Sequence, residues 1–267
     1  MTTLSVISLG RRDYAEMARA QEQLAADRLE GKIGDLLLLL EHPSTYTLGR
    51  RSEPSDLLHD TSWYRAQGIS ICETPRGGKV TWHGPGQLVA YPVIDLRGLG
   101  TQPAEAGRVD VAGFVGSLES SMARTLAEWG LVAGRIEGLT GLWIDDERPR
   151  PADFEGVSAV DAAPGLARGS IRKIGSIGLR IHRGVSTHGL SINVNCDLEP
   201  FNWINSCGIE SCRPTSIATE LGNDGPSVES VGAAIAAGIG AATGLVPVKC
   251  DPGQVGLPEA RPENSVA

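Results

Sequence analysis

The sequence predicts a mixed α/β protein of the α+β kind, in which helices pack on a mixed β-sheet. Short apolar runs bounded by turn residues, at 34–43 and 87–96, are typical of buried strands. Two longer segments, 13–30 and 108–130, repeat apolar residues at the three-to-four spacing of an amphipathic helix. Because the order is neither a strict alternation of strand and helix nor all strand, a mixed sheet with helices packed on it is favoured.

The N-terminal part begins with an expected strand at 3–8, followed by the 13–30 helix. Asp13 and Glu16 form a capping pair at the start of this helix, and Gly31 can end it. The next expected elements are strands at 34–43, 44–52, 69–75 and 87–96.

The C-terminal part is expected to continue after the 108–130 helix. Residues 146–170 are rich in Pro, Gly, Ala and acidic residues, which predicts a surface loop insertion. The chain is expected to form a single domain over 1–250, with a flexible tail at 251–267 that has little to bury. The remaining expected elements are strands at 131–136, 141–145, 171–182 and 185–195 and helices at 214–221 and 228–243.

The composition is ordinary for a globular protein of 267 residues, with 41% hydrophobic and 21% charged residues. A net charge of −8 argues against nucleic acid as a partner, since duplex binders need a basic face. Five scattered cysteines and a start without a charged segment followed by an apolar one favour a reducing cytoplasm. The uncharged segment 230–248 is rich in Ala and Gly, so a buried helix is favoured over a membrane span.

Two stretches carry basic residues and no acidic ones. Residues 75–94 contain Arg76 and Lys79, and residues 170–196 contain Arg172, Lys173, Arg180 and Arg183. Such stretches are either solvated patches or a positive rim for an acidic carrier, and composition alone leaves both interpretations open.

The glycine-rich segment RGGKVTWHGPGQL, residues 76–88, is the first candidate for a binding site. Gly77 and Gly78 let backbone approach a ligand, and the turn after His83 exposes N–H groups of the kind that stabilise oxyanions. His83 is expected to orient such donors or to contact a substrate carbonyl. Most glycine-rich turns are only turns, so that interpretation stays open as well.

Cys207 is the candidate nucleophile among the cysteines. It lies in a polar Asn-Ser-Cys-Gly turn in the same half of the chain as the basic stretch, whereas Cys72 and Cys196 lie near strands. A free thiol with a pKa of ~8.5 needs a nearby cation to become a thiolate at neutral pH. The alternative is a small buried residue. A zinc site with His182 and His188 is disfavoured, because the cysteine spacings are not those of zinc ligands.

Three segments together resemble the lipoyl (octanoyl) transferase family. They are RGGKVTWHGPGQLVAYPVIDL, RKIGSIGLRIHRGVSTHGLSINVN and FNWINSCGI, in this order, and the similarity extends over about 5–245. The resemblance implies the fold shared with lipoate and biotin protein ligases. It also implies that Cys207 is the acyl-thioester nucleophile and that Lys173 lowers its pKa. The substrate-binding residues that it implies are Arg76, Gly77, Gly78, Lys79, Val80, Thr81, Trp82, His83, Ser176, Ile177, Gly178, Gly189, Leu190 and Ser191.

The family resemblance implies transfer of an octanoyl group from octanoyl-acyl carrier protein to a lysine of lipoyl domains. Acceptors of this kind are the lipoyl domains of 2-oxoacid dehydrogenase complexes and the glycine cleavage H protein. No ATP and no metal is expected, and neither nucleic acid, a membrane nor a second copy of the chain is expected as a partner. The alternatives are an ATP-dependent lipoate–protein ligase, a catalytically silent carrier-binding scaffold and a cysteine hydrolase.

Overall fold

The computed structural model describes residues 2–99, 109–136, 139–145, 171–205, 213–222 and 224–259. The predicted loop at 146–170 and the candidate nucleophile Cys207 therefore lie outside the described residues. The described helices are α1 (Tyr14–Leu29), α2 (Thr61–Ala66), α3 (Val111–Ala127), α4 (Ile217–Leu221) and α5 (Val228–Thr243). The described strands are β1 (Thr3–Arg11), β2 (Asp35–Glu41), β3 (Thr45–Leu48), β4 (Ser70–Glu73), β5 (Thr81–His83), β6 (Gln87–Val93), β7 (Gly134–Ile136), β8 (Leu139–Asp145), β9 (Ile171–His182), β10 (Val185–Asn193), β11 (Arg213–Pro214) and β12 (Val246–Lys249).

The three long helices begin and end where their sequence signals lie. The side chain of Asp13 accepts a hydrogen bond from the Glu16 N–H at 2.9 Å, and Gly31 adopts a positive φ after the last turn of α1. Asp110 caps α3 in the same way, and Ser227 caps α5. The predicted helices at 13–30, 108–130 and 228–243 are thus confirmed to within a few residues.

A large mixed sheet forms the centre of the molecule. Its strand order in the described residues is β12-β1-β2-β6-β10-β9-β8-β7, with β11 added beside β9. β1 runs parallel to β12 and β2, whereas the strands from β2 through β6, β10, β9 and β8 to β7 pair antiparallel. The predicted mixed sheet is confirmed.

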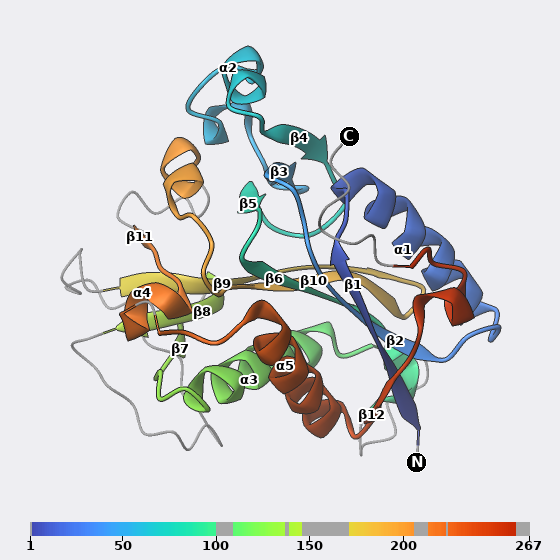
Figure 1. Ribbon diagram of the computed structural model, residues 1–267. Helices are drawn as coiled ribbons and strands as arrows, with labels where there is room; N and C mark the ends of the chain where they lie inside the picture. The colour runs from blue at the N-terminus through green and yellow to red at the C-terminus, as the bar shows by residue number, and fades with distance from the viewer. Residues whose placement is uncertain are drawn as a thin grey trace.

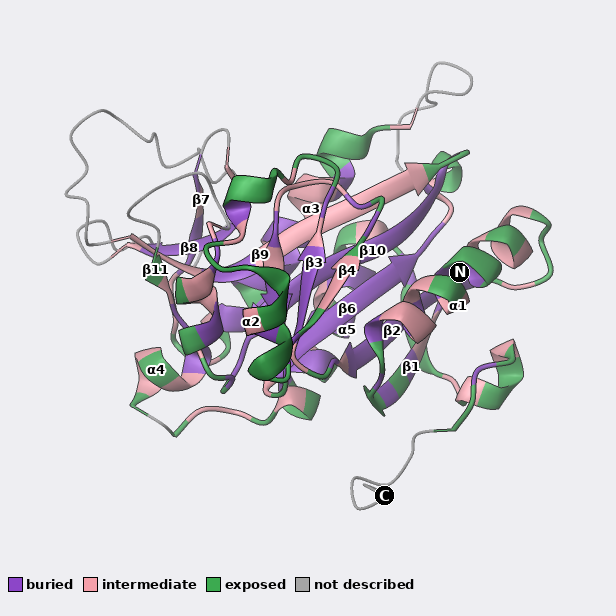
Figure 2. Ribbon diagram, turned by 90° about the horizontal axis from the view of Figure 1, so that it is seen from above, coloured by how far each residue is buried: buried purple, intermediate pink, exposed green. Residues whose placement is uncertain are grey.

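Helices cover both faces of this sheet (Figure 1), and β2 shows how the sequence divides between them. Leu37 and Leu39 point toward the core beneath the sheet that includes α3 and α5, while Leu36, Leu38 and Leu40 pack on the side of α1. Because both faces are buried, β2 is a continuous run of leucines instead of an alternating strand. Figure 2 shows the buried strands β2, β6 and β10 in the middle of the molecule.

A second, smaller sheet stands on the same side of the main sheet as α1. It has the order β4-β3-β5, and α2 lies beside it (Figure 1). Tyr46, Tyr64 and Trp82 form the buried centre of this part, together with residues of the segment that follows β10. The sequence analysis did not predict β5 or α2, because elements of three to six residues carry no measurable periodicity.

The first part of the predicted loose tail is packed against the fold. Leu257 is buried in the core around α1, and the Arg12 guanidinium donates hydrogen bonds to the backbone carbonyls of Pro258 and Glu259. The expectation of a flexible tail is therefore wrong for 251–259, because one leucine and one buried arginine hold that segment. Residues 260–267 lie outside the described part of the chain.

The uncharged segment near the C-terminus forms α5 and the edge strand β12. Val231, Ile235 and Ile239 of α5 are buried against the main sheet, which confirms the predicted buried helix. None of the helices in the described ranges is both long enough and apolar enough to cross a membrane.

Candidate active site

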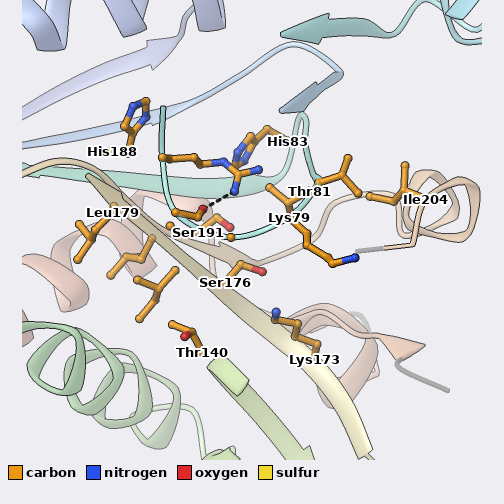
Figure 3. A pocket seen from close by; sticks show the side chains of 18 of the residues that line it. Lys79, Thr81, His83, Thr140, Lys173, Ser176, Leu179, His188, Ser191 and Ile204 are labelled. Atoms are coloured by element: carbon orange, nitrogen blue, oxygen red, sulfur yellow. Dashed lines mark hydrogen bonds between the residues drawn. The ribbon is translucent and has the colours of Figure 1, made fainter. Parts of the chain in front are cut away.

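A cavity of about 830 Å³ lies between the small sheet and strands β9 and β10 of the main sheet. Its size falls in the ~300–1,000 Å³ range of small-molecule sites. The segment before β5 forms one wall, β9 and β10 form another, and β8 and the segment before Cys207 complete it. Figure 3 shows Lys79 and Lys173 entering this space from different walls, with Ser176 between them.

The three sequence segments predicted to bind substrate meet at this cavity. Antiparallel pairing of β9 and β10 places Gly178 opposite Gly189 and Ser176 opposite Ser191. The predicted residues that line the cavity are Arg76, Gly77, Gly78, Lys79, Val80, Thr81, His83, Lys173, Ser176, Ile177, Gly178, Gly189, Leu190 and Ser191. Their contacts with substrate remain predictions, as does the role of Cys207, which the described residues do not include.

Trp82 is the predicted residue whose side chain is set back from the cavity. Side chains alternate along β5, so Thr81 and His83 face the cavity and Trp82 faces the centre of the small sheet. There its indole donates a hydrogen bond to the Ser44 hydroxyl at 2.9 Å and packs edge-on against Phe201. The structure thus gives its side chain a supporting position beneath the binding segment.

A β-bulge in β9 brings Lys173 and Ser176 to the same cavity. In a regular strand, residues three apart point to opposite faces. Pairing with β8 shifts by one residue here, since Leu142 lies opposite Gly175 whereas Trp143 lies opposite Lys173. Ile174 is buried in the main core, and a Cβ on Gly175 would meet Met122 of α3, so both face away from the cavity. The extra residue therefore re-aims the strand.

Lys173 is half-buried and lies over Trp143, with its Nζ 4.9 Å from the centroid of the indole ring. The neighbouring Arg172 points elsewhere and forms a two-point ion pair with Glu220 of α4, with nitrogen–oxygen distances of 2.7 and 2.8 Å. This separation agrees with the expectation that Arg172 and Lys173 occupy opposite faces of the strand. Of the two, Lys173 is the basic side chain that lines the cavity.

Arg76 is a buried structural clamp. Its side chain is 6% exposed and donates hydrogen bonds to the Thr47 hydroxyl and carbonyl and to the Gly77 carbonyl. Gly178 leaves room for it, because an added Cβ there would lie 3.0 Å from Arg76 Cδ. Burial and these three acceptors commit its guanidinium to the interior, so Arg76 forms neither a solvated patch nor an exposed positive rim.

His83 is held by a directed chain of hydrogen bonds. A backbone carbonyl only accepts, so Asn193 donates its Nδ2–H to Thr215 O at 2.8 Å and offers its Oδ1 to Gln87 Nε2, also at 2.8 Å. Gln87 is then left with Oε1 to accept the Nδ1–H of His83 at 2.7 Å. Burial, followed by the neighbouring His42, lowers the pKa of His83 well below its usual value. A neutral His83 therefore carries its proton on Nδ1 and has an unprotonated Nε2.

Two more histidines surround this site in neutral form. His42 donates its Nδ1–H to Arg12 O at 2.7 Å and accepts from the Tyr91 hydroxyl at 2.8 Å. His188 lies near Tyr14 and lines the cavity. Burial lowers the pKa of both His42 and His188 to about 4. Among the described residues, no group of three or more His, Cys, Asp and Glu side chains is arranged to hold a metal ion.

Several residues of the site escaped the sequence analysis. Gln87 and Asn193 are polar side chains that are almost wholly buried at one end of strands β6 and β10, which is a readable signal for a hydrogen-bond network. Tyr14 of α1 and Trp143 of β8 also line the cavity, and the sequence analysis did not single them out.

Comparison with protein families matches residues 13–240 to the lipoyl protein ligase A/B catalytic domain. An octanoyltransferase of Salinispora arenicola is 41% identical over 219 residues, which are 82% of this chain and 86% of the relative. An octanoyltransferase of Chloroflexus aurantiacus is 40% identical over 248 residues, which are 92% of this chain and 97% of the relative. These matches confirm the predicted resemblance and the acyltransferase class.

Solved structures confirm the predicted fold at low sequence identity. A bipartite lipoate protein ligase of Thermoplasma acidophilum superposes with a TM-score of 0.64 at 12% identity, covering 94% of this chain and 88% of the other. A lipoate-protein ligase A bound with ATP gives a TM-score of 0.59 at 15% identity, covering 94% and 88%. Sequence and structure agree, and the chain belongs to the lipoyl protein ligase A/B catalytic-domain family.

Proposed function

We propose that this protein transfers an octanoyl group from octanoyl-acyl carrier protein to a lysine of a lipoyl domain, through a thioester on Cys207. The observation that carries this proposal is Lys173 lining a cavity built by all three family segments, in a chain about 40% identical to octanoyltransferases. Acceptors of the same chemistry are the lipoyl domains of 2-oxoacid dehydrogenase complexes and the glycine cleavage H protein. The three described cysteines that are free thiols support a reducing, cytoplasmic setting.

The reaction divides into two acyl transfers. In the first, the Cys207 thiolate attacks the octanoyl carbonyl, a carbon–sulfur bond forms, and the pantetheine thiol leaves with a proton. In the second, the lysine amine attacks the acyl-enzyme, loses a proton, and releases Cys207. Exchange of one thioester for another is nearly balanced and formation of the amide is downhill, so no ATP is required. Covalent catalysis lets the two carriers use one site in turn.

Lys173 is proposed to stabilise the thiolate, to protonate the leaving thiol and later to accept a proton from the incoming amine. Lys173→Arg keeps the positive charge but does not release a proton at neutral pH. We expect it to lower turnover at least about 100-fold, the lower limit usual for general acid–base catalysis. Turnover by the Lys173→Arg variant near that of the wild type would refute proton transfer and leave only charge stabilisation.

Backbone N–H groups of the glycine-rich segment are candidate oxyanion donors, and the structure distinguishes between Gly77 and Gly78. The Gly77 N–H already donates to the Leu179 carbonyl at 2.9 Å, so it is committed to the fold. Gly78, with φ +87 on the cavity wall, is the better candidate within this turn. His83 does not suit the acyl carbonyl oxygen, because an unprotonated Nε2 can accept a hydrogen bond but cannot donate one. It fits a thiol or amine proton.

The carrier-docking rim is also smaller than the sequence implied. Arg76 is buried, and Lys79 is paired with the buried Asp56 at 3.1 Å. Arg51 lines the cavity, Arg183 lies in the turn between β9 and β10, and both side chains are exposed. They are the better candidates for contacts with an acidic carrier. If they steer the carrier, the second-order rate constant should fall steeply with ionic strength, and a flat salt dependence would argue against this rim.

Intact-protein mass spectrometry tests the central proposal. Wild type and Cys207→Ala are mixed with octanoyl-acyl carrier protein without ATP. We expect a hydroxylamine-labile octanoyl adduct on the wild type and none on the variant. Absence of an adduct, with octanoylation of a lipoyl domain only after ATP is added, would instead make this chain a ligase like its solved structural neighbours.

A further inference from the structure

The β8 segment Thr140-Gly141-Leu142-Trp143 builds a slot around Lys173. Trp143 lies directly opposite Lys173 across the β8–β9 pair, and the lysine Nζ sits 4.9 Å from its ring centroid. An ammonium within about 6 Å of an indole face is attracted by the ring quadrupole. The ring is 3% exposed and packs beside Ile136, so its orientation is fixed by the fold.

Gly141 leaves room on another side of the lysine. An added Cβ would lie 3.0 Å from Lys173 Cε, 3.5 Å from its Nζ and 2.6 Å from the Gly175 carbonyl oxygen. Its φ of +124 also suits glycine alone. The buried carboxylate of Glu119 on α3 holds this part of β8, since Oε1 accepts the Gly141 N–H at 3.1 Å while Oε2 pairs with Arg135 at 3.1 Å.

From this geometry we infer that Trp143 is a positioning residue for Lys173, with Gly141 providing the space and Glu119 holding β8 at Gly141. The inference rests on the proposed function in one respect: the ammonium held in place is the one assigned to act on Cys207. The ring contributes through its face and not through a hydrogen bond, because Trp143 Nε1 is buried without a hydrogen-bond partner in the described part of the chain. Phenylalanine therefore keeps the relevant feature and leucine removes it.

Nuclear magnetic resonance tests the position without reference to activity. The chain contains four lysines, namely Lys32, Lys79, Lys173 and Lys249, so reductive methylation with ¹³C-formaldehyde yields few signals, which Lys→Arg variants assign. We expect the Lys173 methyl protons of the wild type to be shifted upfield by the indole ring. The shift should vanish in Trp143→Leu and persist in part in Trp143→Phe. Lys173 methyl signals that coincide with those of Lys32 in the wild type would overturn the inference.

Kinetics tests the consequence. With unmethylated protein, Trp143→Leu should slow formation of the acyl-enzyme about 10-fold with an unchanged KM for octanoyl-acyl carrier protein, while Trp143→Phe stays within about threefold. Trp63→Leu, on α2, is the matched control and should match the wild type. An equal loss in the Leu and Phe variants with lowered melting temperatures would show a merely structural role and overturn the inference. A ring-current shift in a wild type that forms no acyl-enzyme would refute the proposed function while leaving the position of Lys173 established.

Discussion

Gln87→Leu should test the hydrogen-bond chain that orients His83. Gln87 is 1% exposed, accepts from His83 Nδ1 and donates to the Trp82 carbonyl and to Asn193 Oδ1. Leucine has a similar size, so the change removes three hydrogen bonds with little change in packing.

The expected cost follows from the groups left behind. Three buried polar atoms lose their partner, and each costs ~1–3 kcal/mol when unsatisfied. Burial of the leucine returns ~2 kcal/mol. The free energy of unfolding should therefore fall by about 3 kcal/mol, which urea titration measures as a lower midpoint at constant slope.

Gln23→Leu is the matched control, because Gln23 is exposed on α1 and bonds only to Asp27 among the described residues. It should change the unfolding free energy by no more than about 0.5 kcal/mol. If Gln87→Leu falls in that same range, the chain from Thr215 to His83 contributes nothing to stability and the assigned tautomer of His83 loses its basis.

Three further outcomes are expected. Burial lowers the pKa of His42 and His188 to about 4, so below pH 6.5 the unfolded chain binds protons that the folded chain does not. The free energy of unfolding should therefore fall by about 2 kcal/mol per histidine between pH 7 and pH 5. Urea titrations at the two pH values check this, and equal midpoints would contradict it. Gly189→Ala should destabilise the protein by about 2 kcal/mol in the same assay, because a Cβ would clash with Ala90 O of β6 and lie 2.6 Å from Pro92 Cδ. An unchanged midpoint would mean that β6 shifts to accept the methyl group at no cost. Removing 251–267 should lower the thermal midpoint by the equivalent of about 2 kcal/mol, since Leu257 is lost from the core and Arg12 loses two carbonyl partners. An unchanged melting curve would restore the expectation of a loose tail.

The elements that the sequence predicted are those with a repeated signal. The helices at 13–30, 108–130 and 228–243 each combine a capping side chain with an apolar face, and the leucine run of β2 marks a strand buried on both faces. The missed strand β5 of the small sheet carries no such repeat, since it has three residues. Its position is set by pairing with β3, which local sequence does not reveal.

Residue types at the site were more predictable than their roles. The basic stretch with Arg76 suggested a solvated patch or a positive rim for an acidic carrier, yet Arg76 is buried and holds β3 to the turn after β4. A histidine beside a sharp turn suggested a donor to a carbonyl, yet the acceptor groups around Gln87 leave His83 with an unprotonated Nε2. Both differences arise from partners distant in sequence, and so from the fold.

The bulge in β9 shows most directly why a strand pattern was insufficient. Regular alternation would place Lys173 and Ser176 on opposite faces, and one of them would then point into the core around α3. Two successive residues, Ile174 and Gly175, instead face that core, where a Cβ on Gly175 would force the end of the Met122 side chain to shift. The bulge costs regular pairing with β8, but it brings a cation and a hydroxyl to one cavity from a single strand. The extra residue in β9, with a glycine that fits beside Met122, therefore sets the position of Lys173 at the cavity.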